Sequence, residues 1–171
     1  LLNLDRLQNP TGVELRVQRL QDIHVLQDPP ADAFSIHPVS ISQARGFIPP
    51  PEGNHRVRIR GIVTFRSPGR ELYVQDSGGG ICVKTDQADP VETGDEVEVI
   101  GFRSVEETGI CLRSAEFSVV GKAKSPPLIS LRASEVLNLE NRDRLVRVEG
   151  RVLHDTQPAA APELALTDGR D

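Results

Sequence analysis

Short runs in which apolar and polar residues alternate, separated by turn-forming residues, fill the middle of this chain. They occur at 56–65, 71–76, 81–85, 96–102 and 110–120. Alternation with a period of two places every second side chain on one face, which is the pattern of a half-buried β-strand. Glycine, proline and serine between the runs supply turns. The sequence therefore predicts five β-strands in this region, with no long helix among them.

The order and lengths of these strands narrow the fold. The first run is long and is interrupted at Gly61, which predicts a bulge or bend at that glycine. The next two runs continue it as a meander through the turns at 67–69 and 77–80, and a polar gap precedes the fourth. This inventory is typical of a five-stranded OB-type barrel, although a small sandwich or an SH3-like barrel has a similar strand count. We therefore expect an all-β, OB-like barrel in which strand one pairs with strand four and strand three with strand five.

The chain also resembles itself. Residues 58–63 align with 147–152 at an offset of 89, and residues 71–76 align with 163–168 at an offset of 92. The three-residue difference falls in the first hairpin loop, where insertions are tolerated. Repetition of this kind indicates tandem modules of one fold. Two further matches support the repeat: 38–41 with 128–131, and 11–16 with 108–113.

The repeat predicts three parts. Residues 1–38 are expected to be the tail, or last strand, of a preceding OB-like module, residues 39–124 a complete module, and residues 125–171 the first strands of a following module. Because the chain starts without an initiator methionine, we expect it to be a piece of a longer protein. An unpaired edge strand is a liability. Residues 1–30 and 140–171 are therefore expected to combine into a second sheet or barrel.

The composition excludes several classes of protein. Of the 171 residues 37% are hydrophobic, and no apolar run approaches the roughly 18 residues of a membrane span. The chain has 20 Lys+Arg against 25 Asp+Glu, and this net charge of −5 argues against non-specific binding to phosphate backbones.

The charges are segregated along the chain. Five arginines lie between 56 and 70, and eight acidic residues lie between 86 and 107. The arginines either line a groove for an anion or nucleic acid, or form a solvated strand face. In the second case, pairing of strands one and four sets Arg58 and Arg60 against Glu96 and Glu98 as opposite-charge neighbours.

The meander and the fourth strand resemble a known pattern. The sequence YVQDSGGGICV at 73–83, followed by TGDEVEVIG at 93–101, resembles the OB-fold repeats in the extracytoplasmic regions of bacterial two-component sensor histidine kinases. It is also similar to OB modules attached to secreted bacterial nucleases. The resemblance covers residues 40–127 and rests on turn glycines and core-filling Val and Ile residues, so it specifies a fold more than a chemistry. It implies a non-enzymatic binding module in the extracytoplasmic (periplasmic) part of a membrane-anchored signalling protein.

OB architecture directs attention to the outer face of strands two and three and the loops beside it. The partner expected there is an unidentified small ligand or protein, besides neighbouring modules of the same chain. Single-stranded nucleic acid is the alternative partner. Few aromatic rings support this alternative: only Tyr73 and Phe65 could stack on bases, and Phe102 and Phe117 are expected to pack inside. A structural spacer without a ligand is the third possibility. The expected ligand-binding residues are Arg66, Arg70, Tyr73, Gln75, Lys84, Glu106 and Glu107.

The two cysteines, Cys82 and Cys111, lie on strands three and five. Pairing of these strands permits a disulfide, which suits an oxidising compartment, and two free thiols are the alternative. The four histidines are scattered, and no metal, nucleophile or phosphate-loop motif occurs, so we expect no cofactor and no catalytic residue. Asp76, just before the glycines at 78–80, is expected to cap the amides of that turn.

Overall fold

The computed structural model describes residues 2–4, 10–13, 16–26, 28, 30–46, 55–106, 109–123, 128–156 and 163–167. The chain forms two compact units, residues 1–33 and 34–171. In the first unit, β1 (Leu2–Leu4) pairs antiparallel with β2 (Pro10–Val13), and η1 (Leu20–Asp22) is a single 3-10 turn. Among the described residues of this unit, none after β2 belongs to a strand.

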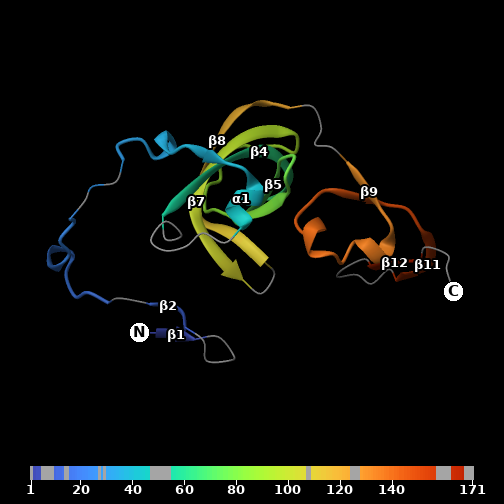
Figure 1. Cartoon of the computed structure of the whole chain (residues 1–171), viewed down its shortest axis with the longest axis horizontal. Helices are drawn as coiled ribbons and strands as arrows, with labels where there is room; N and C mark the ends of the chain where they lie inside the picture. The colour runs from blue at the N-terminus through green and yellow to red at the C-terminus, as the bar shows by residue number, and fades with distance from the viewer. Residues whose placement is uncertain are drawn as a thin grey trace. The chain divides into compact units, whose positions relative to one another are not determined.

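Five strands of the second unit close into a ring (Figure 1). Strand β4 pairs antiparallel with β5 and β5 with β6; β6 pairs parallel with β8, β8 antiparallel with β7, and β7 antiparallel with β4. This order defines an all-β, OB-like barrel. The predicted fold is confirmed, including the pairing of strand one with four and of three with five. The strands are β4 (Arg56–Ser67), β5 (Glu71–Gln75), β6 (Gly80–Lys84), β7 (Asp95–Glu106) and β8 (Gly109–Lys122).

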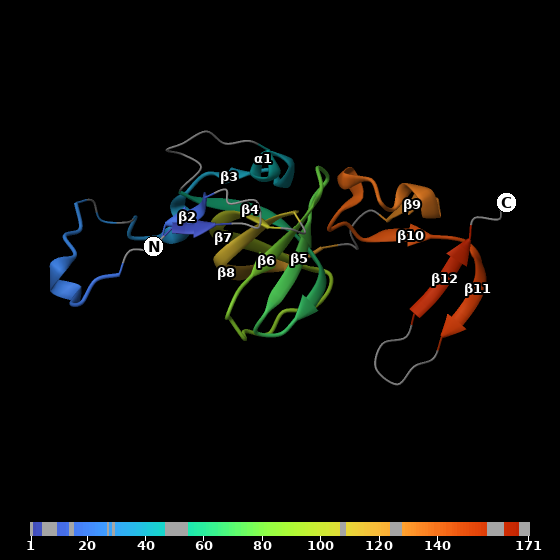
Figure 2. The same ribbon diagram turned by 90° about the horizontal axis from the view of Figure 1, so that it is seen from below.

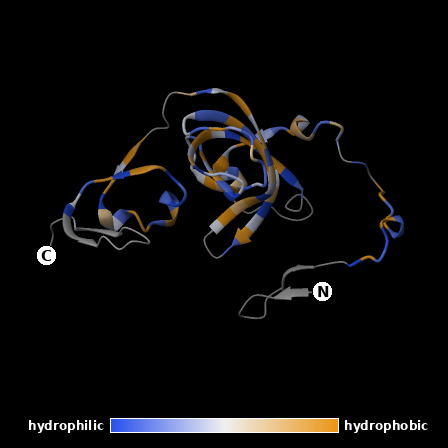
Figure 3. Cartoon of the chain, turned by 180° about the vertical axis from the view of Figure 1, so that it is seen from behind, coloured by the Kyte–Doolittle hydropathy of each residue, from blue (hydrophilic) through white to orange (hydrophobic). Residues whose placement is uncertain are grey.

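Alternation divides each strand between a core face and an outer face. Along β5, Leu72 and Val74 are buried, whereas Glu71 and Tyr73 are partly exposed. Figure 3 shows apolar and polar positions alternating along the strands of the ring. Burying each large aliphatic side chain contributes about 1.5–3 kcal/mol. The core is made of Ile41, Ala44, Ile59, Val63, Leu72, Val74, Ile81, Val83, Val91, Val97, Val99, Leu112, Ala115 and Phe117.

Strand β4 takes part in two ladders, pairing with β7 along its first half and with β5 along its second. Gly61 lies where the two meet. A Cβ atom there would come within 2.7 Å of Val74 Cγ1 and 2.8 Å of the Gln75 carbonyl oxygen. The register shift itself falls between Val63 and Phe65. The predicted irregularity therefore lies beyond the glycine, because Gly61 serves the close approach of β5 and not a bulge.

A second irregularity lies between β7 and β8. The register shifts between Ile100 and Phe102, and Ser114 on the opposite strand has a φ of 46°, in the left-handed region. Phe102 is 41% exposed, with the Arg56 guanidinium 5.3 Å from its ring centroid. Phe117 is in the core, as predicted. The prediction that Phe102 packs inside is wrong, because Phe102 shares the outward face of β7 with Glu96 and Glu98, and the extra residue of the bulge lies on β8.

A short lead-in precedes the ring and plugs one side of the core. Ser40 caps the short helix at Ile41–Arg45. Its Oγ accepts the N–H of Gln43 at 3.2 Å, and the Gln43 side chain accepts the N–H of Ser40 at 3.0 Å. Ile41 and Ala44 on that helix are fully buried. Of the helices among the described residues, none has the length and apolar character needed to cross a membrane. The lead-in consists of η2 (Ala33–Ser35), β3 (Pro38–Val39), which pairs parallel with β4, and α1 (Ile41–Arg45).

The lead-in and the first hairpin recur after the barrel, and Figure 2 shows β12 lying against β11. Strand β9 pairs parallel with β10, as β3 does with β4. Arg151 faces Thr167 as Ile62 faces Gln75, and the register of both hairpins shifts after the next pair. Paired residues of the second hairpin thus lie 89 residues (first strand) and 92 residues (second strand) after their counterparts in the first hairpin, which are the offsets seen in the sequence. The elements are β9 (Ile129–Leu131), η4 (Ala133–Glu135), η5 (Leu139–Asn141), β10 (Val146–Val148), β11 (Arg151–Thr156) and β12 (Glu163–Thr167).

The described ladders leave the ends of the chain in separate sheets. Strand β1 pairs with β2, and β11 pairs with β12. A ladder between residues 1–30 and 140–171 is not among those that the described residues form. The division into modules at 38 and 124 stays a prediction.

Candidate functional site

Ion pairs cross the β4–β7 ladder. Arg58 Nη2 lies 2.7 Å from Glu98 Oε1, and Arg60 Nε lies 2.9 Å from Glu96 Oε1. Since Arg60 is directly opposite Glu98 in the ladder, the pairs form along the diagonal. Arg58 also donates to the Ile36 carbonyl at 3.1 Å. The predicted opposite-charge pairing is confirmed, and these two arginines are engaged within the fold.

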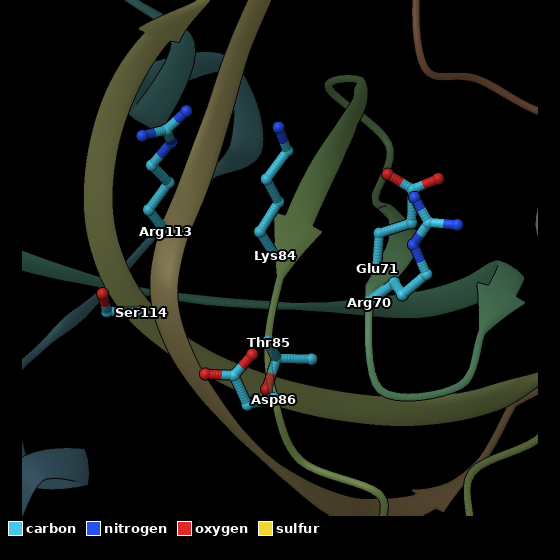
Figure 4. A pocket seen from close by; sticks show the side chains of 7 residues that line it. All are labelled: Arg70, Glu71, Lys84, Thr85, Asp86, Arg113 and Ser114. Atoms are coloured by element: carbon cyan, nitrogen blue, oxygen red, sulfur yellow. The ribbon is translucent and has the colours of Figure 1, made fainter.

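A polar groove with a volume of about 430 Å³ lies on the outer face of the barrel. In the β5–β6 ladder Glu71 is directly opposite Lys84, so strand pairing itself brings charged groups together here. Figure 4 shows the side chains of Arg70, Lys84 and Arg113 extending to the same side from three separate segments. The groove is lined by Arg70, Glu71, Lys84, Thr85, Asp86, Arg113 and Ser114.

Glu106, the last residue of β7, holds two of the groove's cations. Its Oε2 lies 2.5 Å from Lys84 Nζ, and its Oε1 lies 2.6 Å from Arg113 Nε. The hydrogen bond from Lys84, together with that from Arg113, lowers the pKa of Glu106, and the same contact with Glu106 raises the pKa of Lys84. Glu106 and Lys84 therefore stay charged around neutral pH, and the two ion pairs join Glu106, Lys84 and Arg113 into one network.

Arg70 is held differently. It lies in the turn between β4 and β5, and its backbone carbonyl accepts the N–H of Thr85 at 3.2 Å, which ties the turn to the end of β6. Its side chain is exposed, and it has no ion pair with any residue that the structure describes. The guanidinium therefore keeps its N–H donors available to a ligand.

A second cavity of about 430 Å³ shares Glu71 with the groove. The rings of Phe65 and Tyr73 meet edge to face, with centroids 5.8 Å apart. Burial raises the pKa of Tyr73 to about 12, so the phenol stays protonated. The carboxyl groups of Glu71 and Asp143 lie beside these rings, which disfavours a nucleic-acid phosphate. The cavity is lined by Thr64, Phe65, Glu71, Tyr73, Asp143, Arg144 and Leu145.

The structure brings part of the predicted site together. Arg70 and Lys84 line the groove, Glu106 holds its cations, and Tyr73 lines the second cavity. Gln75 is fully buried, and its Oε1 accepts the N–H of Leu145 at 2.8 Å. A later part of the chain therefore already occupies the Gln75 amide oxygen, and a contact of Gln75 with an external ligand stays a prediction.

Two other predicted residues are not in the groove. Arg66 donates from Nη1 to the Val91 carbonyl and from Nη2 to the Asp89 carbonyl, both at 2.8 Å. It therefore fastens the loop before β7. Glu107 lies outside the described residues.

Five residues that line the groove are not among those predicted from the sequence: Glu71, Thr85, Asp86, Arg113 and Ser114. A signal was available for Arg113, because it alternates with Leu112 and so faces outward from β8 next to Lys84 of β6. Ser114 enters through the bulge between β7 and β8, which no sequence pattern marks.

Cys82 and Cys111 lie directly opposite each other in the parallel β6–β8 ladder. Both are buried free thiols, and burial raises the pKa of each. The predicted adjacency is confirmed, and the disulfide stays a prediction. Among the residues with described placement, no three His, Cys, Asp or Glu side chains gather as a metal site would require.

Asp76 fixes the turn between β5 and β6. Its Oδ1 accepts the N–H groups of Gly78 at 2.7 Å and Gly79 at 2.9 Å, which confirms the predicted cap. Its Oδ2 accepts the N–H of Ile41 at 2.9 Å, so the same carboxylate also ties the turn to α1.

No protein-family model and no curated protein matches the chain. Among solved structures, the hypothetical protein YgiW from E. coli is 18% identical, over 49% of this chain and 92% of YgiW, with a TM-score of 0.39. A putative aspartyl-tRNA synthetase from Leishmania major Friedlin is 15% identical, over 58% of this chain and 23% of the synthetase, with a TM-score of 0.43. The assignment to an OB-like fold rests on the closed ring of strands.

Proposed function

We propose that the chain is a non-enzymatic OB-fold interaction module from the extracytoplasmic (periplasmic) sensing region of a membrane-anchored bacterial signalling protein, a two-component sensor histidine kinase. The sensor context rests on the resemblance of residues 40–127. A binding role is supported by the groove at Arg70, Lys84 and Arg113. This groove lies on the outer face of the second and third barrel strands, where OB barrels hold their ligands. Any kinase activity would belong to other parts of such a protein.

The chemistry of the groove favours binding over catalysis. A general acid or base works best with a pKa near the working pH. The contact between Glu106 and Lys84 moves both pKa values away from neutrality. The described residues that line the groove include no histidine and no cysteine. The groove thus offers fixed charges and no group poised to exchange a proton.

The same charges indicate the class of ligand. Lys84 and Arg113 both pair with the single carboxylate of Glu106, whereas Arg70 has no ion pair with a described residue and can meet an anionic group. Asp86 and Ser114, which also line the groove, offer an acceptor and a hydroxyl. A polar small molecule or a polar protein segment that carries one carboxylate or similar anion suits this arrangement.

Single-stranded nucleic acid is less well supported. The only ring pair on this face among the described residues, Phe65 and Tyr73, is joined edge to face and lies beside the carboxyl groups of Glu71 and Asp143. Base stacking needs free ring faces, and strand binding needs unpaired cations along the backbone path.

In a sensor, binding at this groove would shift the relative orientation of neighbouring modules and pass the change toward a membrane helix. Such a shift is limited by the difference in ligand affinity between the two orientations.

Signalling by the full-length protein tests the proposal. Arg70→Glu puts a negative charge where the ligand's anion binds, so it should abolish the response. Arg147→Glu is the control, because Arg147 is an exposed arginine on β10, outside the groove. Loss of the response in the first variant alone supports the proposal. Equal, intact responses in both, at equal protein levels, would favour the structural spacer.

Two further measurements separate the remaining alternatives. Fluorescence anisotropy with a labelled oligodeoxythymidylate of about 15 nucleotides, within the usual site size of one OB fold, should detect no saturable binding at low salt. Tight, salt-sensitive binding would establish the nucleic-acid alternative. Protease added outside intact spheroplasts should degrade this part of the full-length protein, and complete resistance would contradict an extracytoplasmic location.

A further inference from the structure

One end of the outer face of β5 and β6 is covered by the chain itself. Residues 139–145, which we call the strap, run from η5 toward β10. Leu145 donates its N–H to Gln75 Oε1 at 2.8 Å, and Arg144 Nη2 donates to the Ser77 carbonyl at 3.4 Å. The strap therefore lies on the end of the face where Gln75 and Gly80 are opposite each other.

Arg45, the last residue of α1, joins the barrel to the strap. Its Nη1 donates to the carbonyls of Gly80 at 3.1 Å and Arg142 at 3.3 Å, and its Nη2 donates to the carbonyl of Leu139 at 3.1 Å. A single guanidinium thus satisfies main-chain acceptors on both sides of the contact, as its fork of donors allows. The positive charge also suits the carbonyl end of the η5 turn.

Gly80 and Asp143 are fitted to each other. The Asp143 carbonyl group occupies the space that a Cβ atom on residue 80 would need, so only glycine permits the contact. Asp143 itself has a φ of 63°, a left-handed conformation that aspartate tolerates better than most residues. In this conformation the Asp143 carbonyl lies against Gly80 of β6.

The strap explains why outward-facing residues of the sheet are buried. Cys82 alternates with the core residues Ile81 and Val83, so its side chain belongs to the outer face. It is nevertheless only 4% exposed, and Gln75 and Cys111 on the same face are 0% and 2% exposed. Burial is the main cause that raises the pKa of both thiols, and the negative charge of Asp143 adds to it.

From these contacts we infer that the Gln75–Gly80 end of the barrel's outer face is a docking surface for a turn of polypeptide, and that its occupant is the strap of the same chain. The barrel and α1 bind main-chain groups of the strap through hydrogen bonds to the N–H of Leu145 and the carbonyls of Leu139 and Arg142. A polypeptide turn with one left-handed residue fits such a surface, whereas nucleic acid does not. The strap thereby fastens the segment that leads into β10 to the preceding barrel.

The docking surface is distinct from the polar groove. The groove lies at the Glu71–Lys84 end of the same two strands, and the strap lies at the Gln75–Gly80 end. The inference therefore holds whether or not the groove binds a ligand. In this inference, one half of the outer face binds a segment of the same chain. The two thiols should become accessible when the strap is released, so their reactivity measures that release.

Thiol labelling of the reduced, full chain under native conditions tests the inference. Gly80→Ala removes the space for the Asp143 carbonyl, and Leu145→Pro removes the N–H that Gln75 accepts. Each should raise the rate at which a maleimide reacts with the cysteines by about fivefold, because the loss of one hydrogen bond of ordinary net strength changes an opening equilibrium by about that ratio. Gly79→Ala is the control: its Cβ would meet the nearest atoms at 3.6 Å, an ordinary contact.

Urea unfolding of each variant separates strap release from loss of the whole fold. Faster labelling in folded Gly80→Ala and Leu145→Pro, with Gly79→Ala labelling at the unmodified chain's rate, supports the inference. Labelling of both folded variants at the unmodified rate would overturn it. If Gly80→Ala does not fold, Leu145→Pro decides alone, since residue 145 lies outside the barrel strands.

Discussion

Arg58 Nη2 lies 2.7 Å from Glu98 Oε1, and only 18% and 15% of these two side chains are exposed. Next to them, Arg60 and Glu96 make the same kind of pair at 2.9 Å, with 53% and 31% exposed. An uncompensated charge costs more where water is excluded, and exposed pairs contribute little. The two pairs are therefore a matched comparison within one ladder.

Removing the covered carboxylate should destabilise the barrel more than removing the exposed one. We expect Glu98→Ala to lower the free energy of unfolding by about 1–3 kcal/mol and Glu96→Ala to lower it less, because water screens an exposed pair. Urea unfolding followed by circular dichroism measures both. Double-mutant cycles with Arg58→Ala and Arg60→Ala then isolate each pair. Equal coupling energies in the two cycles would contradict the expectation.

Gly61 should be the less replaceable of two strand glycines. Its Cβ would press on Val74 and on the Gln75 main chain, so Gly61→Ala should cost about 1–3 kcal/mol of stability through overpacking. The control is Gly121→Ala on β8, where the nearest atom, Glu96 Oε2, is 3.6 Å away. Differential scanning calorimetry should find a lowered midpoint for the first variant and almost no change for the second. A similar shift in both would refute the close approach at Gly61.

The Glu106 network makes a prediction about pH. A carboxyl whose pKa is lower in the folded chain than in the unfolded chain stabilises the fold above the unfolded pKa. That contribution disappears as the pH falls through the folded pKa. Because Lys84 and Arg113 lower the pKa of Glu106, the unmodified chain should lose this contribution on acidification below about pH 4.3, the ordinary value for glutamate. Glu106→Gln lacks the titration and should lose less stability over the same range.

Urea midpoints measured from about pH 7 to about pH 3 check this difference. Glu140→Gln, at an exposed carboxyl in η5, is the control for removing one acidic group. A curve for Glu106→Gln that runs parallel to that of the unmodified chain would show that the network does not contribute as described.

The two phenylalanines flanking the β7–β8 bulge should differ in their share of the stability. Phe117 is 6% exposed within the core, so Phe117→Ala should cost about 3–5 kcal/mol. Phe102 lies largely outside under the Arg56 guanidinium, and Phe102→Ala should cost about 1 kcal/mol, the size of an exposed cation–π contact. Chemical denaturation of the two variants side by side gives both values. Comparable losses would show that Phe102 is a core residue after all.

The barrel is predictable from residues 56–122 because its signals are local. Alternation identifies the strands, and Asp76 before three glycines identifies a capped turn. The spacing of the runs then suggests the OB order, from which the pairing of Arg58 and Arg60 with two glutamates follows. Each step depends on side-chain types that occur at short, regular intervals.

Other features depend on long-range or main-chain contacts and leave no such signal. The cover over Gln75 is made by the N–H of Leu145, 70 residues later, and any residue except proline has that group. Ser114 lines the groove because of a bulge in β8 whose position no residue type announces. Arg66 and Arg70 belong to the same arginine-rich stretch, and the sequence does not distinguish them. Only the fold shows that Arg66 reaches the carbonyls of a neighbouring loop.

The matched registers of the two hairpins have a consequence for how such modules change over time. Three residues separate Ser67 from Glu71, and six separate Thr156 from Glu163, yet the paired positions on either side correspond one to one. The register of the hairpin therefore does not depend on the length of the loop that connects its two strands. Insertions during evolution, or a label inserted in an experiment, can lengthen this connecting loop without shifting the register of the strands.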